Sequence, residues 1–122
     1  MSKTYDFLKE CGPFYVLTIN GDYPAGRPFG AVMEDGEDLY LATNDMNQAH
    51  KQMRENGHIQ IVASKPNSRE WIRITGIVKE CNNMDMKAKM FEKCPNLYKH
   101  YESYEAEHFI MFKVNVEKVE MK

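Results

Sequence analysis

A polar corner between two regular segments is the stretch of this 122-residue sequence best suited to chemistry. Thr43, Asn44 and Asp45 follow an alternating apolar run and precede a helical pattern. Asn44 or Asp45 is expected to cap that helix with its side-chain oxygen. The Thr43 hydroxyl and the unpaired N–H groups of the first helical turn would then lie together, where the helix dipole is positive. This set of donors predicts a binding site for an anion.

Lys51 is the cation best placed to complete this corner. It lies six residues beyond Asp45, roughly 9 Å of helical rise, and helical side chains lean toward the N-terminus. Its ammonium could therefore reach back to the same anion, although a solvated lysine at an ordinary strand–helix junction remains an alternative. The apolar side of the helix is predicted to consist of Met46, Ala49, His50 and Met53.

The elements that must position this corner are mostly strands. Strands are predicted over residues 14–20, 27–34, 39–43, 58–63, 70–80, 108–114 and 115–121, and helices over 3–10, from the polar corner to about 56, and over 83–93. Asn20-Gly21 and Asp35-Gly36 indicate hairpin turns, and Gly76 inside the longest strand indicates a bend or bulge. The segment 24–26 is expected to be irregular. This order predicts one mainly β (α+β) domain over residues 1–122, a six- to seven-stranded antiparallel barrel with peripheral helices.

Composition and charge narrow the classes of function. The net charge of -2, with interspersed lysines and glutamates, predicts no nucleic-acid partner. No apolar run is long enough for a membrane span, and the first ten residues lack the apolar core of a signal peptide, so a cytoplasmic protein is expected. The three cysteines have no CxxC spacing and are expected to be reduced thiols. The histidines have no ligand spacing, so no metal site is predicted. No residue is singled out as a catalytic acid or base.

Four motifs in a fixed order carry a family resemblance. They are Arg27-Pro28-Phe29-Gly30, Thr43-Asn44, Lys51-Gln52 and Trp71-Ile72-Arg73-Ile74-Thr75-Gly76. With them the chain resembles, over nearly its whole length, small members of the pyridoxamine 5'-phosphate oxidase-like family, the FMN-binding split barrels. The resemblance implies a homodimer with two FMN sites at the subunit interface. It also implies an oxidoreductase that passes electrons between a reduced nicotinamide, or another donor, and an unidentified small acceptor. A non-enzymatic module that stores or senses flavin or haem is the alternative.

The resemblance also assigns the site residues. Arg27, Pro28, Phe29 and Gly30 match the strand along the flavin ring and ribityl chain, and Thr43 and Asn44 match the turn that contacts the flavin. Lys51 and Gln52 match the helix beside the phosphate. Trp71 and Arg73 match positions that face the cofactor or the dimer partner. Gln48 and Ala49 stand where the larger oxidases carry an Arg-Lys pair for the phosphate. More of the phosphate charge is therefore expected to fall to Arg27 and Lys51. The chain is too short for the C-terminal segment with which vitamin B6 oxidases hold pyridoxal phosphate, so that activity is not expected.

Overall fold

Seven antiparallel strands form one sheet in the computed structural model, which describes residues 2–122. In chain order the elements are α1 (Ser2–Cys11), β1 (Phe14–Asn20), β2 (Tyr23–Phe29), β3 (Val32–Asp35), β4 (Asp38–Asn44), α2 (Gln48–Glu55), β5 (His58–Ser64), β6 (Trp71–Glu80), α3 (Met84–Lys93), the 3-10 helix η1 (Pro95–Lys99) and β7 (Phe109–Met121). No helix within this part of the chain is both long enough and apolar enough to span a membrane.

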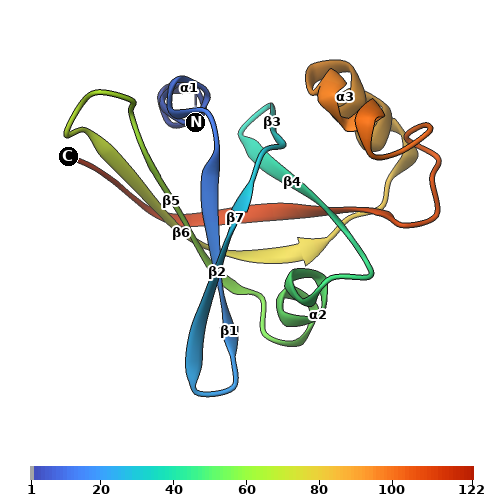
Figure 1. Ribbon diagram of the computed structural model, residues 1–122, viewed down its shortest axis with the longest axis horizontal. Helices are drawn as coiled ribbons and strands as arrows, with labels where there is room; N and C mark the ends of the chain where they lie inside the picture. The colour runs from blue at the N-terminus through green and yellow to red at the C-terminus, as the bar shows by residue number, and fades with distance from the viewer. Residues whose placement is uncertain (1) are drawn as a thin grey trace.

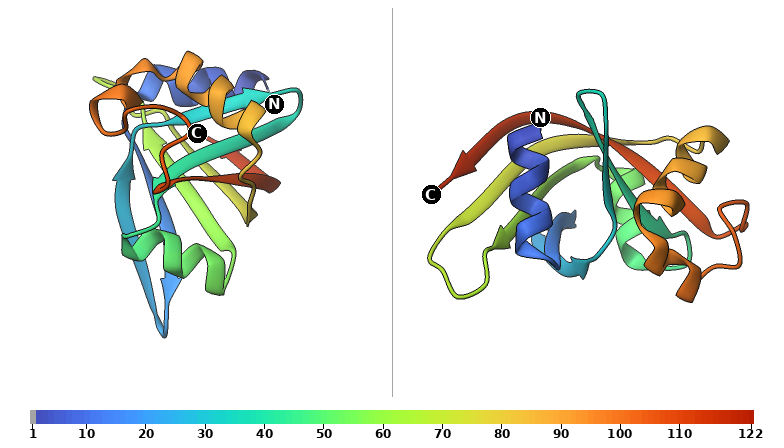
Figure 2. Two further views of the ribbon diagram at one scale, coloured as in Figure 1. Left: turned by 90° about the vertical axis from the view of Figure 1, so that its right-hand side faces the viewer. Right: turned by 90° about the horizontal axis from the view of Figure 1, so that it is seen from above.

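The two edges of the sheet are consecutive in the chain. The strand order is β2-β1-β5-β6-β7-β4-β3, and β2 runs into β3 through Gly30 and Ala31. The sheet therefore curls until its first and last strands approach each other, while no ladder joins β2 to β3 among residues 2–122. This is a split barrel, and the predicted fold class is confirmed with seven strands. Figures 1 and 2 show α1 and α3 at one end of the barrel and α2 at the opposite end.

The prediction of one strand over 27–34 was wrong. The segment 24–26, expected to be irregular, belongs to β2, which starts at Tyr23. Pro24 and Pro28 lack N–H donors, and they are tolerated because β2 is an edge strand that pairs only with β1. The strand then breaks at Gly30 because the chain must cross from one edge of the sheet to the other.

The C-terminal strands predicted over 108–114 and 115–121 are one continuous strand, β7. Its first half pairs with β4 and most of its length pairs with β6. The register shifts between Thr75 and Gly76, where Thr75 pairs with Lys118 and Gly76 with Val116. The predicted bulge at Gly76 is therefore confirmed, and it lets one long strand bend around the barrel.

Two apolar clusters fill the fold, one on each side of β4 and β7. Leu39 and Leu41 face the barrel interior, whereas Tyr40 and Ala42 face a second cluster that α3 and η1 cover. In the second cluster the Phe91 ring packs edge-on against Phe109, with 4.8 Å between centroids. Because both faces of these strands are buried, β4 is held rigidly, and its C-terminal end carries the polar corner.

Candidate functional site

A cleft of about 860 Å³ opens where the edge strands meet. Its walls come from the β2–β3 junction, the end of β4, the start of α2, and α3 with η1. The residues that line it are Lys9, Arg27, Pro28, Phe29, Gly30, Ala31, Ala42, Thr43, Asn44, Asn47, Lys93, Cys94, Pro95, Asn96, Leu97, His100 and Tyr101. The cleft thus unites two of the predicted motifs that lie far apart in the sequence, 27–30 and 43–44.

The charge on the walls of the cleft is of one sign. Lys9, Arg27 and Lys93 line it, and no aspartate or glutamate does. Among residues 2–122 none of these three cations has a carboxylate partner. Lys93 Nζ donates instead to the backbone oxygen of Glu34 over 3.1 Å. Unneutralised cations in a concave site favour an anionic ligand.

Arg27 is held from behind by uncharged groups. Its Nη1 donates to Thr18 Oγ1 over 2.7 Å and to the Val16 oxygen over 3.2 Å. Its Nη2 donates to Gln52 Oε1 over 2.8 Å. Burial lowers the pKa of the Arg27 guanidinium from its ordinary value, but an arginine in a protein stays charged. The side chain therefore presents a fixed positive charge to the cleft.

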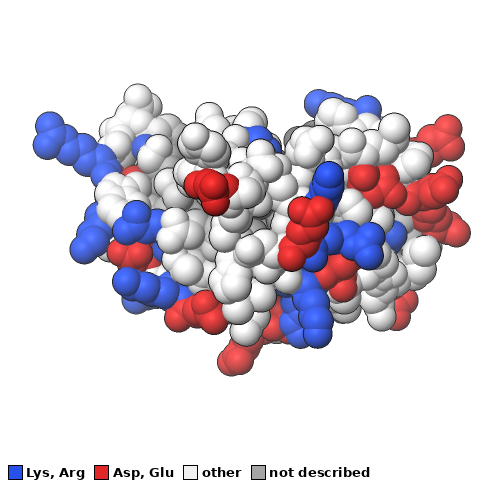
Figure 3. All heavy atoms as spheres, turned by 90° about the horizontal axis from the view of Figure 1, so that it is seen from below, with Lys and Arg blue, Asp and Glu red and all other residues white. Residues whose placement is uncertain are grey.

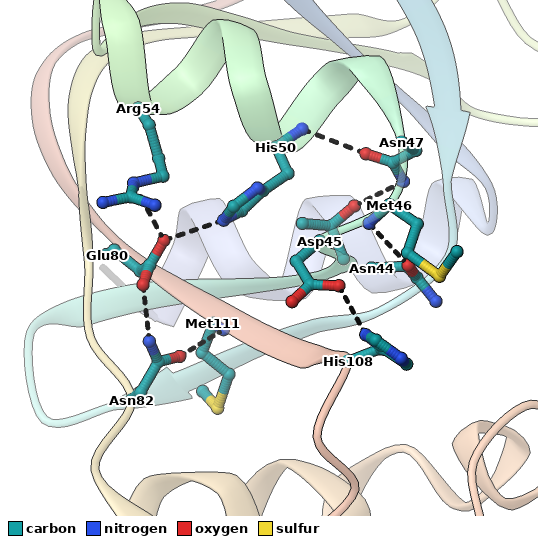
Figure 4. Close-up of polar contacts among 11 residues, drawn as sticks. Asn44, Asp45, Met46, Asn47, His50, Arg54, Glu80, Asn82, His108 and Met111 are labelled. Carbon is teal, nitrogen blue, oxygen red and sulfur yellow. Dashed lines mark hydrogen bonds and ion pairs between the residues drawn. The ribbon is translucent and has the colours of Figure 1, made fainter.

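The turn before α2 supplies polar residues to the lining of the cleft, Thr43, Asn44 and Asn47, and Figure 4 shows the hydrogen bonds within this turn. Asn47 Oδ1 accepts the His50 N–H over 3.0 Å, and Asn47 Nδ2 donates to Thr43 Oγ1 over 2.9 Å. Asn47 is therefore the cap of α2, and the predictions of Asn44 and Asp45 as the cap were wrong. Asn44 Oδ1 accepts the Met46 N–H in a local turn instead.

Two histidine–carboxylate pairs tie this turn to the sheet (Figure 4). Asp45 Oδ1 lies 2.8 Å from His108 Nδ1, which explains why Asp45 is not free to cap α2. His50 Nε2 lies 2.8 Å from Glu80 Oε1, which Arg54 Nε also approaches at 3.5 Å. His50 is buried, as its predicted place on the apolar side of the helix requires. These contacts fix the start of α2 against β6 and β7.

Tyr101 forms part of the opposite wall. Burial raises the pKa of its hydroxyl, as does the charge of Asp45, while a hydrogen bond to Asn44 acts in the opposite direction. The hydroxyl therefore keeps its proton at neutral pH and can donate a hydrogen bond. The Tyr101 ring packs against Phe109, with ring centroids 5.1 Å apart, and the residue also lines the cleft.

A smaller hollow of about 440 Å³ adjoins the cleft and shares Asn44, His100 and Tyr101 with it. Its rim carries three glutamates of the η1–β7 connection, Glu102, Glu105 and Glu107. Figure 3 shows acidic side chains gathered at the right-hand end of the molecule, which is the end with α3 and this connection in Figure 1. Neighbouring hollows therefore differ in the sign of their charge.

The sequence model of the pyridoxamine 5'-phosphate oxidase family matches residues 2–122. The chain belongs to this family. A NimC/NimA family protein from Clostridium acetobutylicum is 32% identical, with 99% of this chain and 90% of that chain covered and a TM-score of 0.89. No curated protein matches the sequence.

Two further solved structures share the fold of the pyridoxamine 5'-phosphate oxidase family with this chain. General stress protein 26 from Bacillus anthracis is 14% identical, covering 99% of this chain and 94% of that chain, with a TM-score of 0.81. The haem storage protein HutZ from Vibrio cholerae is 10% identical, covering 99% and 93%, with a TM-score of 0.79. At these identities the likeness concerns the fold alone.

The other predicted site residues lie outside the cleft. Lys51 is exposed and does not line it. Gln52 is buried behind Arg27 and touches the cleft only through that side chain. Trp71 and Arg73 lie on the outer face of β6, where Arg73 pairs with Glu120 through two hydrogen bonds of 3.0 Å.

Several cleft residues were missed by sequence reasoning. Asn47 could have been predicted as the cap of α2, because it is an asparagine just before the helical pattern and suits that position as well as Asn44 does. Met46 was wrongly placed on the apolar side of α2, since it precedes the helix and is 77% exposed. Lys9 and Lys93 reach the cleft from α1 and α3, and only the packing of those helices brings them there.

Proposed function

We propose that this protein binds FMN non-covalently in the cleft and acts as an oxidoreductase. It would pass electrons between a reduced nicotinamide, or another donor, and a small acceptor. The chain belongs to the pyridoxamine 5'-phosphate oxidase family. The observation that carries the proposal is that the lysines and the arginine lining its cleft, Lys9, Arg27 and Lys93, have no carboxylate partner within residues 2–122. We further propose that the protein works in the cytoplasm, where Cys11, Cys81 and Cys94 would remain free thiols.

The phosphate of FMN fits the basic side of the cleft. Arg27 offers a forked, charged donor, and the N–H groups of Gln48 and Ala49 have no acceptor within the helix because they belong to its first turn. The larger oxidases carry an Arg-Lys pair at these two positions. Lys9 of α1 and Lys93 of α3 add two further cations to the lining of the cleft.

The flavin ring fits the remaining walls. Phe29 and Leu97 offer apolar surface, the β2–β3 junction at Gly30 is open enough for the backbone to approach a flat ligand, and Tyr101 and Asn44 offer hydrogen bonds to its polar edge. The cleft volume of about 860 Å³ lies within the range of cofactor sites. Bound FMN would supply the redox chemistry, while these residues would orient it and balance its charge.

Haem storage or sensing is the second candidate. His100 lines the cleft and is exposed there, and a histidine can ligate haem iron. The structural likeness to a haem storage protein supports keeping this candidate. It requires no electron transfer to a substrate.

The visible spectrum of the purified protein separates the candidates. We expect flavin bands, release of FMN on denaturation as identified by mass, bleaching by NADH or NADPH, and recovery of the bands with an added acceptor. A haem absorption band that His100→Ala abolishes would favour haem storage instead. The oxidoreductase proposal would be contradicted if the bound flavin could not be reduced by a nicotinamide, and if flavin reduced with dithionite were not reoxidised by an acceptor.

We also propose a homodimer with FMN at the subunit interface, as the family resemblance implies, and propose that the subunits contact each other through the outer face of the sheet. Tyr15 and Ile19 on β1 are 54% and 41% exposed and point away from the barrel. Tyr15 pairs across the sheet with Val62, which pairs with Arg73, and the Arg73 guanidinium lies 5.3 Å from the centre of the Trp71 ring. An exposed face that mixes aromatic, aliphatic and arginine side chains has the composition of a protein interface.

Trp71→Ala is expected to weaken this dimer by about 30-fold, because a tryptophan at an interface typically contributes about 2 kcal/mol or more. Sedimentation velocity over a dilution series measures the change. Met84→Ala is the matched control, since Met84 is 51% exposed on α3 and lies off this face. A native protein that stays monomeric at every concentration, or a Trp71→Ala dimer as tight as the native one, would rule out this interface.

A further inference from the structure

The groups that accept hydrogen bonds from the Arg27 guanidinium, the Val16 oxygen and the side chains of Thr18 and Gln52, are all uncharged, and we call them the support of Arg27. Thr18 and Gln52 are 3% and 5% exposed, and the Thr18 hydroxyl donates to Gln52 Oε1, so the two acceptors of the guanidinium touch each other. Burying polar groups is costly unless they are hydrogen-bonded, and here the Thr18 hydroxyl and Gln52 Oε1 are bonded to each other and to Arg27. This buried trio links β1, β2 and α2.

The support occupies one edge of the guanidinium and leaves the other free. Arginine has five N–H donors, and three of those on Nη1 and Nη2 are used by Val16, Thr18 and Gln52. The Nε N–H and the second Nη2 N–H donate to no acceptor within residues 2–122. These two donors form the side edge of the fork, which matches two oxygens of a phosphate or carboxylate.

Arg73 shows in the same molecule what occupies that edge when a carboxylate is available. Its Nε and Nη2 donate to the two carboxylate oxygens of Glu120, each over 3.0 Å. Arg27 lines the cleft with the same pair of donors unpaired within residues 2–122, and its Nη2 donates to an amide oxygen instead of a carboxylate. A carboxylate in place of the amide would neutralise the charge before any ligand arrived.

We propose that Thr18 and Gln52 are positioning residues that hold Arg27 through uncharged acceptors. They leave its Nε–Nη2 edge fully charged for the cofactor phosphate, and so make the cleft select a phosphorylated flavin over an unphosphorylated one. This inference rests on the proposed binding of FMN and adds the residues that set its selectivity. It also gives Gln52 a role that differs from direct contact with the phosphate.

Gln52→Glu tests the inference because it keeps the shape and the acceptor oxygen but adds a charge. We expect the Kd for FMN to rise by about 30-fold, since a charged hydrogen bond to the ligand would be lost to an internal ion pair. The Kd for riboflavin, which lacks the phosphate, should change by no more than about twofold. Fluorescence titration of the flavin-free protein with each ligand measures both values.

Asn20→Asp is the matched control, because it makes the same amide-to-carboxylate change at an exposed position, the last residue of β1. It should leave the ratio of the two Kd values unchanged. Thr18→Val provides a second variant of nearly the same shape, in which a lost acceptor loosens Arg27 and lowers the FMN preference by about fivefold. The ¹⁵N–¹H signal of Arg27 Nε gives a readout in the native protein, and it should be sharp and should shift on adding FMN but not riboflavin.

The outcomes separate this inference from the proposed function. If native protein binds FMN better than riboflavin while Gln52→Glu and Thr18→Val keep the native ratio, the positioning role is overturned and the FMN site stands. If native protein binds neither flavin, the proposed function fails as well. If Gln52→Glu does not fold, Thr18→Val and the Arg27 signal decide between the same two results.

Discussion

Arg27→Ala is expected to weaken FMN binding by about 100-fold. The side chain offers two free N–H donors to the cleft, and hydrogen bonds between charged groups contribute about 1.5–3 kcal/mol each, where 1.4 kcal/mol is tenfold in Kd. The variant should still fold. It should lose about 1–2 kcal/mol of stability, because Thr18 and Gln52 lose a buried partner. Flavin fluorescence titration and thermal unfolding measure the two effects.

Lys51→Ala is the control for this prediction, and it should change the Kd by no more than about twofold. Lys51 is exposed and outside the cleft of its own chain, whereas the sequence assigned the phosphate to Arg27 and Lys51 together. Equal losses in both variants would mean that the phosphate lies over the middle of α2. Full retention of FMN by Arg27→Ala would show that the phosphate does not bind beside Arg27.

Local chemistry made much of the fold predictable from sequence. The hairpins predicted from Asn20-Gly21 and Asp35-Gly36 are present, and Gly21 and Gly36 both have the positive φ that such turns favour. The errors fell where long-range pairing decides. Nothing local indicates that the strand after Arg27 must cross between sheet edges at Gly30, or that β7 runs unbroken through a bulge.

The candidate site was predictable in part for the same reason. The motifs at 27–30 and 43–44 meet in the cleft because β2 and β4 end beside each other once the barrel curls. Gln52 was correctly singled out, but its side chain faces inward to Arg27, which depends on the rotation of α2. Thr18, an alternating strand residue with no motif, gave no sign of its contact with Arg27.

Gly76→Ala is expected to cost about 3 kcal/mol of stability and to lower the melting temperature by about 10 °C. A Cβ at this position would lie 2.5 Å from the Asn115 backbone oxygen and 3.2 Å from Val114 Cγ1. The neighbour is backbone inside the ladder between β6 and β7, so it cannot swing away as a flexible side chain would. Thermal unfolding followed by circular dichroism measures the loss.

Gly26→Ala is the matched control for Gly76→Ala. It also lies in a strand without positive φ, and its Cβ would meet only Leu17 Cγ at an ordinary 3.4 Å. Its stability should stay within about 1 kcal/mol of native or rise slightly, because alanine restricts the unfolded chain. If Gly76→Ala and Gly26→Ala have the same melting temperature, the backbone of β7 can move away from the added Cβ at the bulge, and the close approach there is not rigid. Neither Gly76 nor the residues that its Cβ would meet, Val114 and Asn115, line the cleft. Folded Gly76→Ala should therefore bind FMN with native affinity well below its melting temperature, which separates the stability of the barrel from the binding site.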